Sequence, residues 1–107
     1  MGKIDKALLD IIVLKICQVS NPQKIILFGS YARGEEKEKS DIDIMVIQNS
    51  DKPRYKRSLP IRLALRGIIH SKDIVVYTSE EIKEWASAST SFVATVLREG
   101  KILYEAK

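Results

Sequence analysis

The chain has 107 residues, of which 45% are hydrophobic and 30% charged, and its formal net charge at pH 7 is +4. A chain of this size supports one hydrophobic core and excludes a multidomain enzyme, so we expect a single domain over residues 1–107. The longest apolar stretches have four residues, whereas a membrane span needs about 20, which predicts no membrane association.

The N-terminal segment does not resemble a secretory signal, because the acidic Asp5 precedes any long apolar region. A cytoplasmic location is therefore expected. Cys17 is the single cysteine, which excludes an internal disulfide and a thiolate zinc cluster. Glutamates interrupt the basic residues, whereas nucleic-acid-binding surfaces carry clustered positive charge, so nucleic acid is not the expected direct substrate.

The first half of the chain alternates between helix and strand signals. Apolar residues at helical spacing predict an amphipathic helix over residues 4–19, which Pro22 ends. The apolar, β-branched run 24–28 predicts a buried strand, followed by one helical turn over 30–34. We expect the charged residues 35–39 to form a solvated loop.

The next segment alternates with a period of two and predicts a strand over residues 41–47. Asp41 and Asp43 then share one face with Met45 and Ile47, and the other face is wholly apolar.

A second long helix is expected over residues 54–69, with its regular part beginning at Pro60. The residues expected to face inward are Leu59, Leu63, Leu65 and Ile69, and those expected outward are Arg57, Arg62 and Arg66. His70 is expected to interact with the end of this helix.

The last third of the chain predicts a strand over 72–77 and, from Thr78 and Glu81, a capping box that begins a helix. A final helix around 90–98 is expected to end at Gly100 in a left-handed cap. Residues 102–104 then form an edge strand.

This order of elements predicts an α/β (α+β) fold. Gly29 and Ser30 end the first strand whereas Asp41 begins the second, so these residues adjoin only if the two strands are antiparallel. The helix before the third strand permits a parallel crossover that brings Asp73 level with Asp41 and Asp43. We therefore predict a mixed three- to four-stranded sheet in the order 1-2-3, with helices packed on it.

The aspartates are the candidate catalytic and metal-binding residues. The α-carbons of Asp41 and Asp43 lie about 6.5 to 7 Å apart on one strand face, where carboxylates gain nothing from packing. Like charges about 4 Å apart repel by about 4 kcal/mol at an effective dielectric of 20, so their convergence requires a cation or a proton. Aspartate oxygens suit Mg²⁺, and with Asp73 they are the minimum for a two-metal site that promotes in-line displacement at phosphorus.

Gly29 and Ser30 are candidate phosphate-binding residues. They follow a buried strand and precede a helical turn, where backbone N–H groups are left free to bind an anion. Glycine also lets a phosphate approach the main chain closely.

The linear pattern Gly29-Ser30, ten intervening residues and Asp41-x-Asp43, with Asp73 on a later strand, resembles the DNA polymerase β-like nucleotidyltransferase superfamily. The small size resembles its minimal nucleotidyltransferase (MNT) branch, and the likeness extends over nearly the whole chain. The resemblance implies that Gly29 and Ser30 hold a nucleoside triphosphate and that Asp41 and Asp43 ligate two Mg²⁺ ions. It further implies that Asp73 ligates the catalytic ion and helps to deprotonate the acceptor.

Members of this branch are often antitoxins paired with a HEPN-type ribonuclease toxin, and some transfer AMP from ATP to a tyrosine of the toxin. The resemblance therefore implies a nucleotidyltransferase that acts as an antitoxin on a HEPN-type partner protein. Alternatives are an antitoxin that neutralises its toxin by binding alone, or nucleotidyl transfer to a small molecule or RNA. A homo-oligomer could supply a missing wall of the site.

Several side chains keep two interpretations. Arg33 could bind phosphate bidentately or point outward, and Ser40 could bind the nucleotide or be a turn residue. The basic residues of the second long helix could contact triphosphate, RNA or an acidic partner, although a solvated face is the expectation. They are Arg54, Lys56, Arg57, Arg62 and Arg66.

Overall fold

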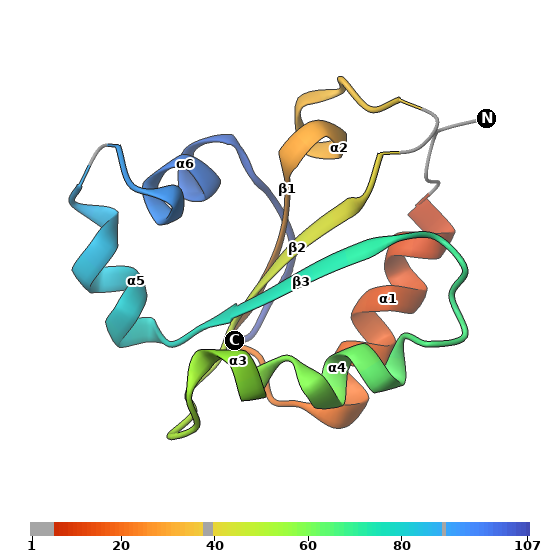
Figure 1. Ribbon diagram of the computed structural model, residues 1–107, viewed down its shortest axis with the longest axis horizontal. Helices are drawn as coiled ribbons and strands as arrows, with labels where there is room; N and C mark the ends of the chain where they lie inside the picture. The colour runs from red at the N-terminus through yellow and green to blue at the C-terminus, as the bar shows by residue number, and fades with distance from the viewer. Residues whose placement is uncertain (1–5, 38–39, 89) are drawn as a thin grey trace.

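The computed structural model describes residues 6–37, 40–88 and 90–107. In chain order the elements are α1 (Lys6–Val19), β1 (Lys24–Phe28), α2 (Gly29–Arg33), β2 (Ile42–Ile47), α3 (Arg54–Arg57), α4 (Leu59–Ala64), β3 (Lys72–Tyr77), α5 (Ser79–Ala86), α6 (Phe92–Glu99) and β4 (Lys101–Glu105). Figure 1 shows a central sheet with helices around it. The expected fold class is confirmed.

The sheet has four strands in the order β3-β2-β1-β4. β1 pairs antiparallel with both β2 and β4, whereas β2 and β3 run parallel. The mixed sheet and the order 1-2-3 are therefore as predicted, and β4 joins at the β1 edge.

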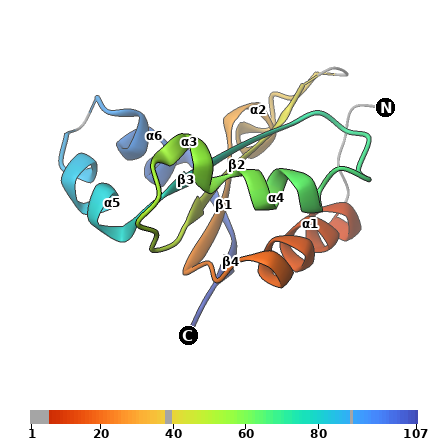
Figure 2. The same cartoon turned by 60° about the horizontal axis from the view of Figure 1, so that its bottom comes forward.

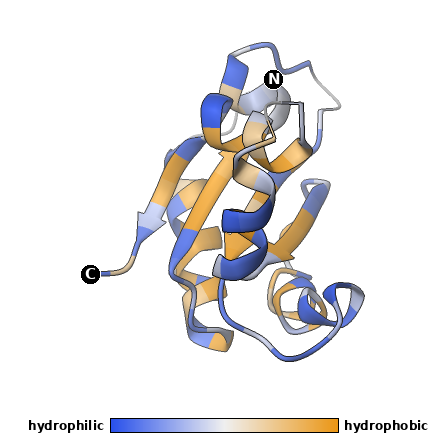
Figure 3. Ribbon diagram, turned by 90° about the vertical axis from the view of Figure 1, so that its left-hand side faces the viewer, coloured by the Kyte–Doolittle hydropathy of each residue, from blue (hydrophilic) through white to orange (hydrophobic). Residues whose placement is uncertain are grey.

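Each face of the sheet has its own hydrophobic cluster, because alternate residues of a strand point to opposite faces. On one face, Ile44 packs with Ile12 of α1 and Ile61 of α4. On the other, Met45 packs with Val93 and Val96 of α6. Figures 1 and 2 show α1 and α4 on one side of the sheet and α5 and α6 on the other, and Figure 3 shows the apolar strands between more polar helices.

The start of the first predicted helix lies outside the described residues, and α1 ends at Val19 as expected. None of the helices in the described ranges is long and apolar enough to cross a membrane.

The long helix predicted over 54–69 is wrong in its extent. Two shorter helices, α3 and α4, replace it, and Pro60 lies in the first turn of α4, where its missing N–H costs no helical hydrogen bond. α4 ends at Ala64, so Ile69 lies beyond it and is fully exposed.

The inward face predicted for this segment is also wrong. Ile61 and Leu65 are buried against the sheet, whereas Leu59 and Leu63 are exposed, because the shortened helix turns the opposite pair of positions toward α1 and β3. Of the predicted inward residues only Leu65 is buried.

Arg57 is not outward. Its side chain is 8% exposed, and its guanidinium donates to the Glu81 carboxylate at 2.7 Å and to the Val76 carbonyl at 3.3 Å. The predicted capping box of α5 is confirmed, since Thr78 and Glu81 exchange hydrogen bonds between side chain and backbone.

Gly100 does not adopt the left-handed cap that we expected, because its φ is −73°. A Cβ at this position would overlap the Ile26 side chain and the Val96 carbonyl, so the glycine is needed for close packing. The left-handed cap occurs at Gly34 instead, after α2, with φ 71°.

Candidate functional site

One row of residues crosses three strands at the end of the sheet nearest α2. Phe28, the last residue of β1, pairs with Asp43 of β2, and Asp43 pairs with Asp73 of β3. Neighbouring strands lie about 4.8 Å apart, so the two aspartates are adjacent on one face. The antiparallel and parallel pairings expected from the sequence produce this row.

Gly29 begins α2 directly beside Asp43. Its φ is +74°, a backbone conformation that L side chains rarely adopt. A Cβ here would overlap the Asp43 carboxylate oxygen and lie 3.0 Å from the Asp43 Cγ. The main chain of the Gly29-Ser30 turn therefore lies against a carboxylate, and only glycine allows this approach.

Asp43 is the half-buried member of the aspartates. Desolvation raises its pKa above the ordinary value, and the charges of Asp73 and Asp41 raise it further, while Arg33 opposes the shift. A carboxyl group whose pKa is raised by burial and by like charges is characteristic of functional sites.

Asp41 lies one residue before β2 and is exposed, as is Asp73. Within the described residues, no three His, Cys, Asp or Glu side chains form a group that could hold a metal ion. The structure thus shows two carboxylates brought together by strand register, with Asp41 close enough to act on Asp43 through its charge.

Arg33, at the end of α2, is held by acidic side chains. Its guanidinium lies 2.9 Å from Glu35 and 3.6 Å from Glu99, and it remains 43% exposed. These ion pairs raise the pKa of Arg33, with the Glu35 hydrogen bond as the largest cause. Arg33 acts on Asp43 through its charge, and its guanidinium already forms ion pairs with Glu35 and Glu99.

Ser40 lies in the segment between α2 and β2. Its hydroxyl accepts a hydrogen bond from the Lys37 N–H at 2.7 Å, which is typical of a turn. Its carbonyl oxygen lies 3.1 Å from the Nε2 of His70, and this same nitrogen lies 3.1 Å from the Tyr31 hydroxyl.

His70 was expected to lie at a helix end, but it contacts α2 and the segment before β2 instead. It thereby links three parts of the chain that carry Gly29, Asp41 and Asp73. No local sequence pattern indicates this role, because Tyr31 and His70 are 39 residues apart and each is ordinary in its local context.

The mixed sheet of this order, with a glycine-initiated turn beside two neighbouring aspartates, agrees with the nucleotidyltransferase fold. The chain belongs to the family described as "Polymerase beta, Nucleotidyltransferase", which matches residues 12–107. It is a nucleotidyltransferase, as the sequence resemblance implied.

A relative from Methanocaldococcus jannaschii, named "Putative protein adenylyltransferase MJ0604", is 41% identical over 83 residues. The match covers 77% of this chain and 78% of the relative.

Solved structures share the fold. One is from a toxin–antitoxin with AMP-PNP, with a TM-score of 0.68 and 26% identity, covering 92% of this chain and 74% of the other. Another is from a tri-AMPylated Shewanella oneidensis HEPN toxin in complex with MNT antitoxin, with a TM-score of 0.63 and 22% identity. That match covers 96% of this chain and 74% of the other.

Proposed function

We propose that this nucleotidyltransferase is a Mg²⁺-dependent protein adenylyltransferase that transfers AMP from ATP to a tyrosine hydroxyl of a HEPN-type toxin, for which it acts as an antitoxin. The observation that carries the proposal is the contact between the Gly29 main chain and the Asp43 carboxylate. It brings an anion-binding turn and a carboxylate together, as phosphoryl transfer requires.

The chemistry of the donors fits Mg²⁺, because Asp41, Asp43 and Asp73 offer only carboxylate oxygens, and Asp41 would have to move toward the adjacent pair Asp43 and Asp73 for all three to hold the ion. The raised pKa of Asp43 supports this assignment, since burial is its largest cause and the like charges of Asp73 and Asp41, which a divalent cation would neutralise, add to it. Bound Mg²⁺ supplies charge stabilisation to the attacking and leaving oxygens.

The remaining groups of the site bind and orient the nucleotide. The backbone N–H groups of Gly29 and Ser30 hold the phosphates, because Phe28 at the N-cap position has no side-chain acceptor to occupy them. Arg33 and Ser40 are weaker candidates for nucleotide contacts, since both already have partners within the protein.

The transfer itself is an in-line displacement. The acceptor oxygen attacks the α-phosphorus, a bond to AMP forms, and the bond to the β-phosphate oxygen breaks so that pyrophosphate leaves. Asp73 accepts the proton of the acceptor hydroxyl. The toxin–antitoxin relationship of two structural neighbours and the name of the M. jannaschii relative support a protein acceptor.

The experiment combines the full chain, Mg²⁺ and a co-expressed HEPN-type partner with ATP labelled at either the α- or the γ-phosphate. The proposal predicts that the partner gains label from the α-phosphate alone and that its intact mass rises by one AMP for each transfer. Asp43→Asn should abolish this gain, whereas Asp51→Asn in the β2–α3 loop should not.

Neutralisation of the partner by Asp43→Asn without any covalent change would contradict catalysis and favour an antitoxin that acts by binding. Label on RNA or on a small molecule, with none on the protein, would assign a different acceptor.

A further inference from the structure

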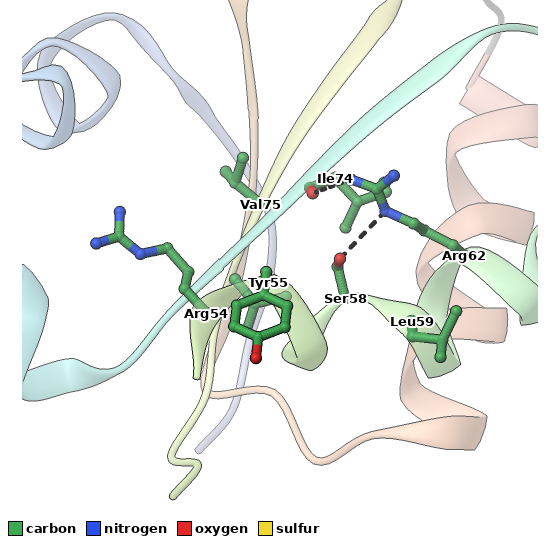
Figure 4. A pocket seen from close by; sticks show the side chains of 8 residues that line it. Arg54, Tyr55, Ser58, Leu59, Arg62, Ile74 and Val75 are labelled. Atoms are coloured by element: carbon green, nitrogen blue, oxygen red, sulfur yellow. Dashed lines mark hydrogen bonds between the residues drawn. The ribbon is translucent and has the colours of Figure 1, made fainter. Parts of the chain in front are cut away.

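A groove lies between the two short helices α3 and α4 and the free edge of β3, with a volume of about 560 Å³. Tyr55, Ser58 and Leu59 line it from the helices, and residues 74–76 line it from the strand. Figure 4 shows Arg54 and Arg62 on opposite sides of these residues. We name this surface, with Leu63 at its continuation along α4, the α3–α4 groove.

The segment that forms the helical wall of the groove is basic. Residues 52–72 contain seven Lys and Arg and no Asp or Glu. Arg57 is buried against Glu81, but no acidic side chain of the described residues forms an ion pair with Lys56, Arg62 or Arg66. The positive charge of these residues is therefore available to an anionic partner.

An apolar stripe accompanies this charge. Tyr55 is 77% exposed, Leu59 56% and Leu63 53%. Leu59 and Leu63 are four residues apart on α4 and so lie on the same helix face, opposite the buried Ile61 and Leu65. Exposed apolar side chains bordered by charge are typical of protein interaction sites.

The strand edge limits what can bind. The carbonyl oxygens of Ile74 and Val76 point to the free edge of β3, where Arg62 and Arg57 donate to them at 3.4 and 3.3 Å. Side chains of this chain thus cover part of the edge that an added strand would pair with. A ligand in the groove must contact side chains, as a docked helix does.

We propose that the α3–α4 groove binds an acidic amphipathic helix of a partner protein. The apolar face of that helix lies on Tyr55, Leu59 and Leu63, and its carboxylates lie on Arg62, which lines the groove, and on Lys56 and Arg66, which lie outside its lining on the same basic segment. A protein is favoured over RNA because only Tyr55 of the three exposed apolar side chains is aromatic, and Leu59 and Leu63 cannot stack on bases, whereas RNA surfaces rely on successive aromatic stacking and phosphate contacts.

The groove lies along β3, the strand that carries Asp73. Ile74 lines the groove and directly follows Asp73 in β3, and successive strand residues point to opposite faces of the sheet, so a partner held in the groove must extend past the β3 edge to present its hydroxyl to Asp73. This step rests on the proposed function, because it makes the bound partner the AMP acceptor.

The probe is a fluorescent peptide of about 18 residues, roughly five helical turns, with leucines along one face and glutamates along the other. Its affinity for the full chain is measured by anisotropy, beside a peptide with lysines in place of the glutamates and an oligouridylate. The acidic peptide should bind more tightly than both.

Two pairs of variants locate the binding. Leu59→Asp/Leu63→Asp and Lys56→Glu/Arg66→Glu should each weaken the acidic peptide by about tenfold or more, the loss typical of central interface residues. Leu14→Asp on α1, where the leucine is 59% exposed, and Lys83→Glu on α5 are matched controls that should bind as the wild type does. Equal affinity of groove and control variants would overturn the proposal, as would tighter binding of oligouridylate that is lost in the same groove variants.

Measuring AMP transfer to the HEPN-type partner, beside the peptide titration, distinguishes failure of this inference from failure of the proposed function. The groove variants should raise the KM for the protein acceptor and leave the KM for ATP unchanged. A wild-type chain that transfers no AMP refutes the proposed function, while the peptide titration still decides whether the groove binds an acidic helix. Unchanged KM values for the acceptor in both groove variants would refute the groove as the acceptor's docking site.

Discussion

Like charges lie together at one end of β3, and opposite charges form an ion pair beyond the other. At its beginning Asp73 lies opposite Asp43, whose pKa is raised by burial and, in addition, by the like charge of Asp73. Beyond its far end the Arg57 guanidinium lies 2.7 Å from Glu81 and, with the Thr78 N–H, lowers the pKa of that carboxyl. The chain thus pairs opposite charges where they hold α3 to α5, and it keeps like charges together where a nucleotide and cation are proposed to bind.

The largest expected effect is on AMP transfer, at the end of β3 where Asp43 and Asp73 lie together. Asp43→Asn should reduce AMP transfer by about a thousandfold or more, because metal-ion stabilisation contributes several kcal/mol to phosphoryl transfer. Initial rates with α-labelled ATP measure this loss.

The same substitution should not destabilise the fold. The folded-state pKa of Asp43 is raised, so ionisation of this group opposes folding as the pH rises above its ordinary value of 3.8. Asp43→Asn should therefore equal or exceed the wild type in free energy of unfolding at neutral pH, and any gain should vanish in acid. A marked loss of stability at pH 7 would make Asp43 a structural residue.

Loss of the Arg57–Glu81 ion pair should lower the free energy of unfolding and leave the reaction chemistry unchanged. Arg57→Met leaves the Glu81 carboxylate without its main partner and should lower the free energy of unfolding by about 3 kcal/mol. Urea unfolding of this variant, beside the exposed Arg66→Met as a control that should change by less than about 0.5 kcal/mol, measures the difference.

The stability contributed by the Arg57–Glu81 ion pair should fall as the pH falls. The folded-state pKa of Glu81 is lowered, so its stabilisation is complete above the ordinary value of 4.5 and is lost as the pH falls through the folded-state pKa. The wild type should lose stability relative to Arg57→Met in that range. Parallel acid unfolding curves would contradict the assignment.

Gly29 and Gly34 offer a smaller and internally matched comparison. Both have φ above +70°, so replacement by Ala should cost each about 1 kcal/mol. Only at Gly29 does the new Cβ meet Asp43, whereas nothing lies within 4 Å at Gly34, so Gly29→Ala should cost about 1 kcal/mol more. Equal losses in thermal unfolding would argue against the close approach.

The smallest expected effect concerns Arg33, whose charge lowers the pKa of Asp43. Arg33→Gln should move the acid limb of the transfer rate to higher pH, because Asp43 then ionises less readily. The rate at neutral pH should change by only about twofold to fivefold, as for exposed ion pairs. A shift to lower pH, or the same shift in Arg98→Gln on α6, would contradict this account.

The strands and the row of aspartates were predictable because a period of two fixes the face of each residue and the chain order limits which strand ends can meet. Asp43 and Asp73 needed only the antiparallel and parallel pairings to become neighbours. The Gly29 contact follows from the same pairings, since Phe28 lies opposite Asp43.

The segment after β2 was not predictable in this way. Apolar residues at 59, 61, 63 and 65 fit two opposite helix faces equally well, and packing against α1 and β3 selects Ile61 and Leu65. The contacts of Arg57 with Glu81 and of Tyr31 with His70 join residues 24 and 39 positions apart, so no local pattern could indicate them.

The central claim is that Asp43 and Asp73 are held together to receive a cation and a nucleotide. An NMR titration of their carboxyl carbons in the full chain, with and without Mg²⁺ and a non-hydrolysable ATP analogue, tests it most directly. We predict that the pKa of Asp43 lies above 3.8 in the unliganded chain and falls below that value when both are added. An Asp43 pKa that stays raised at saturating Mg²⁺ and nucleotide would contradict the claim.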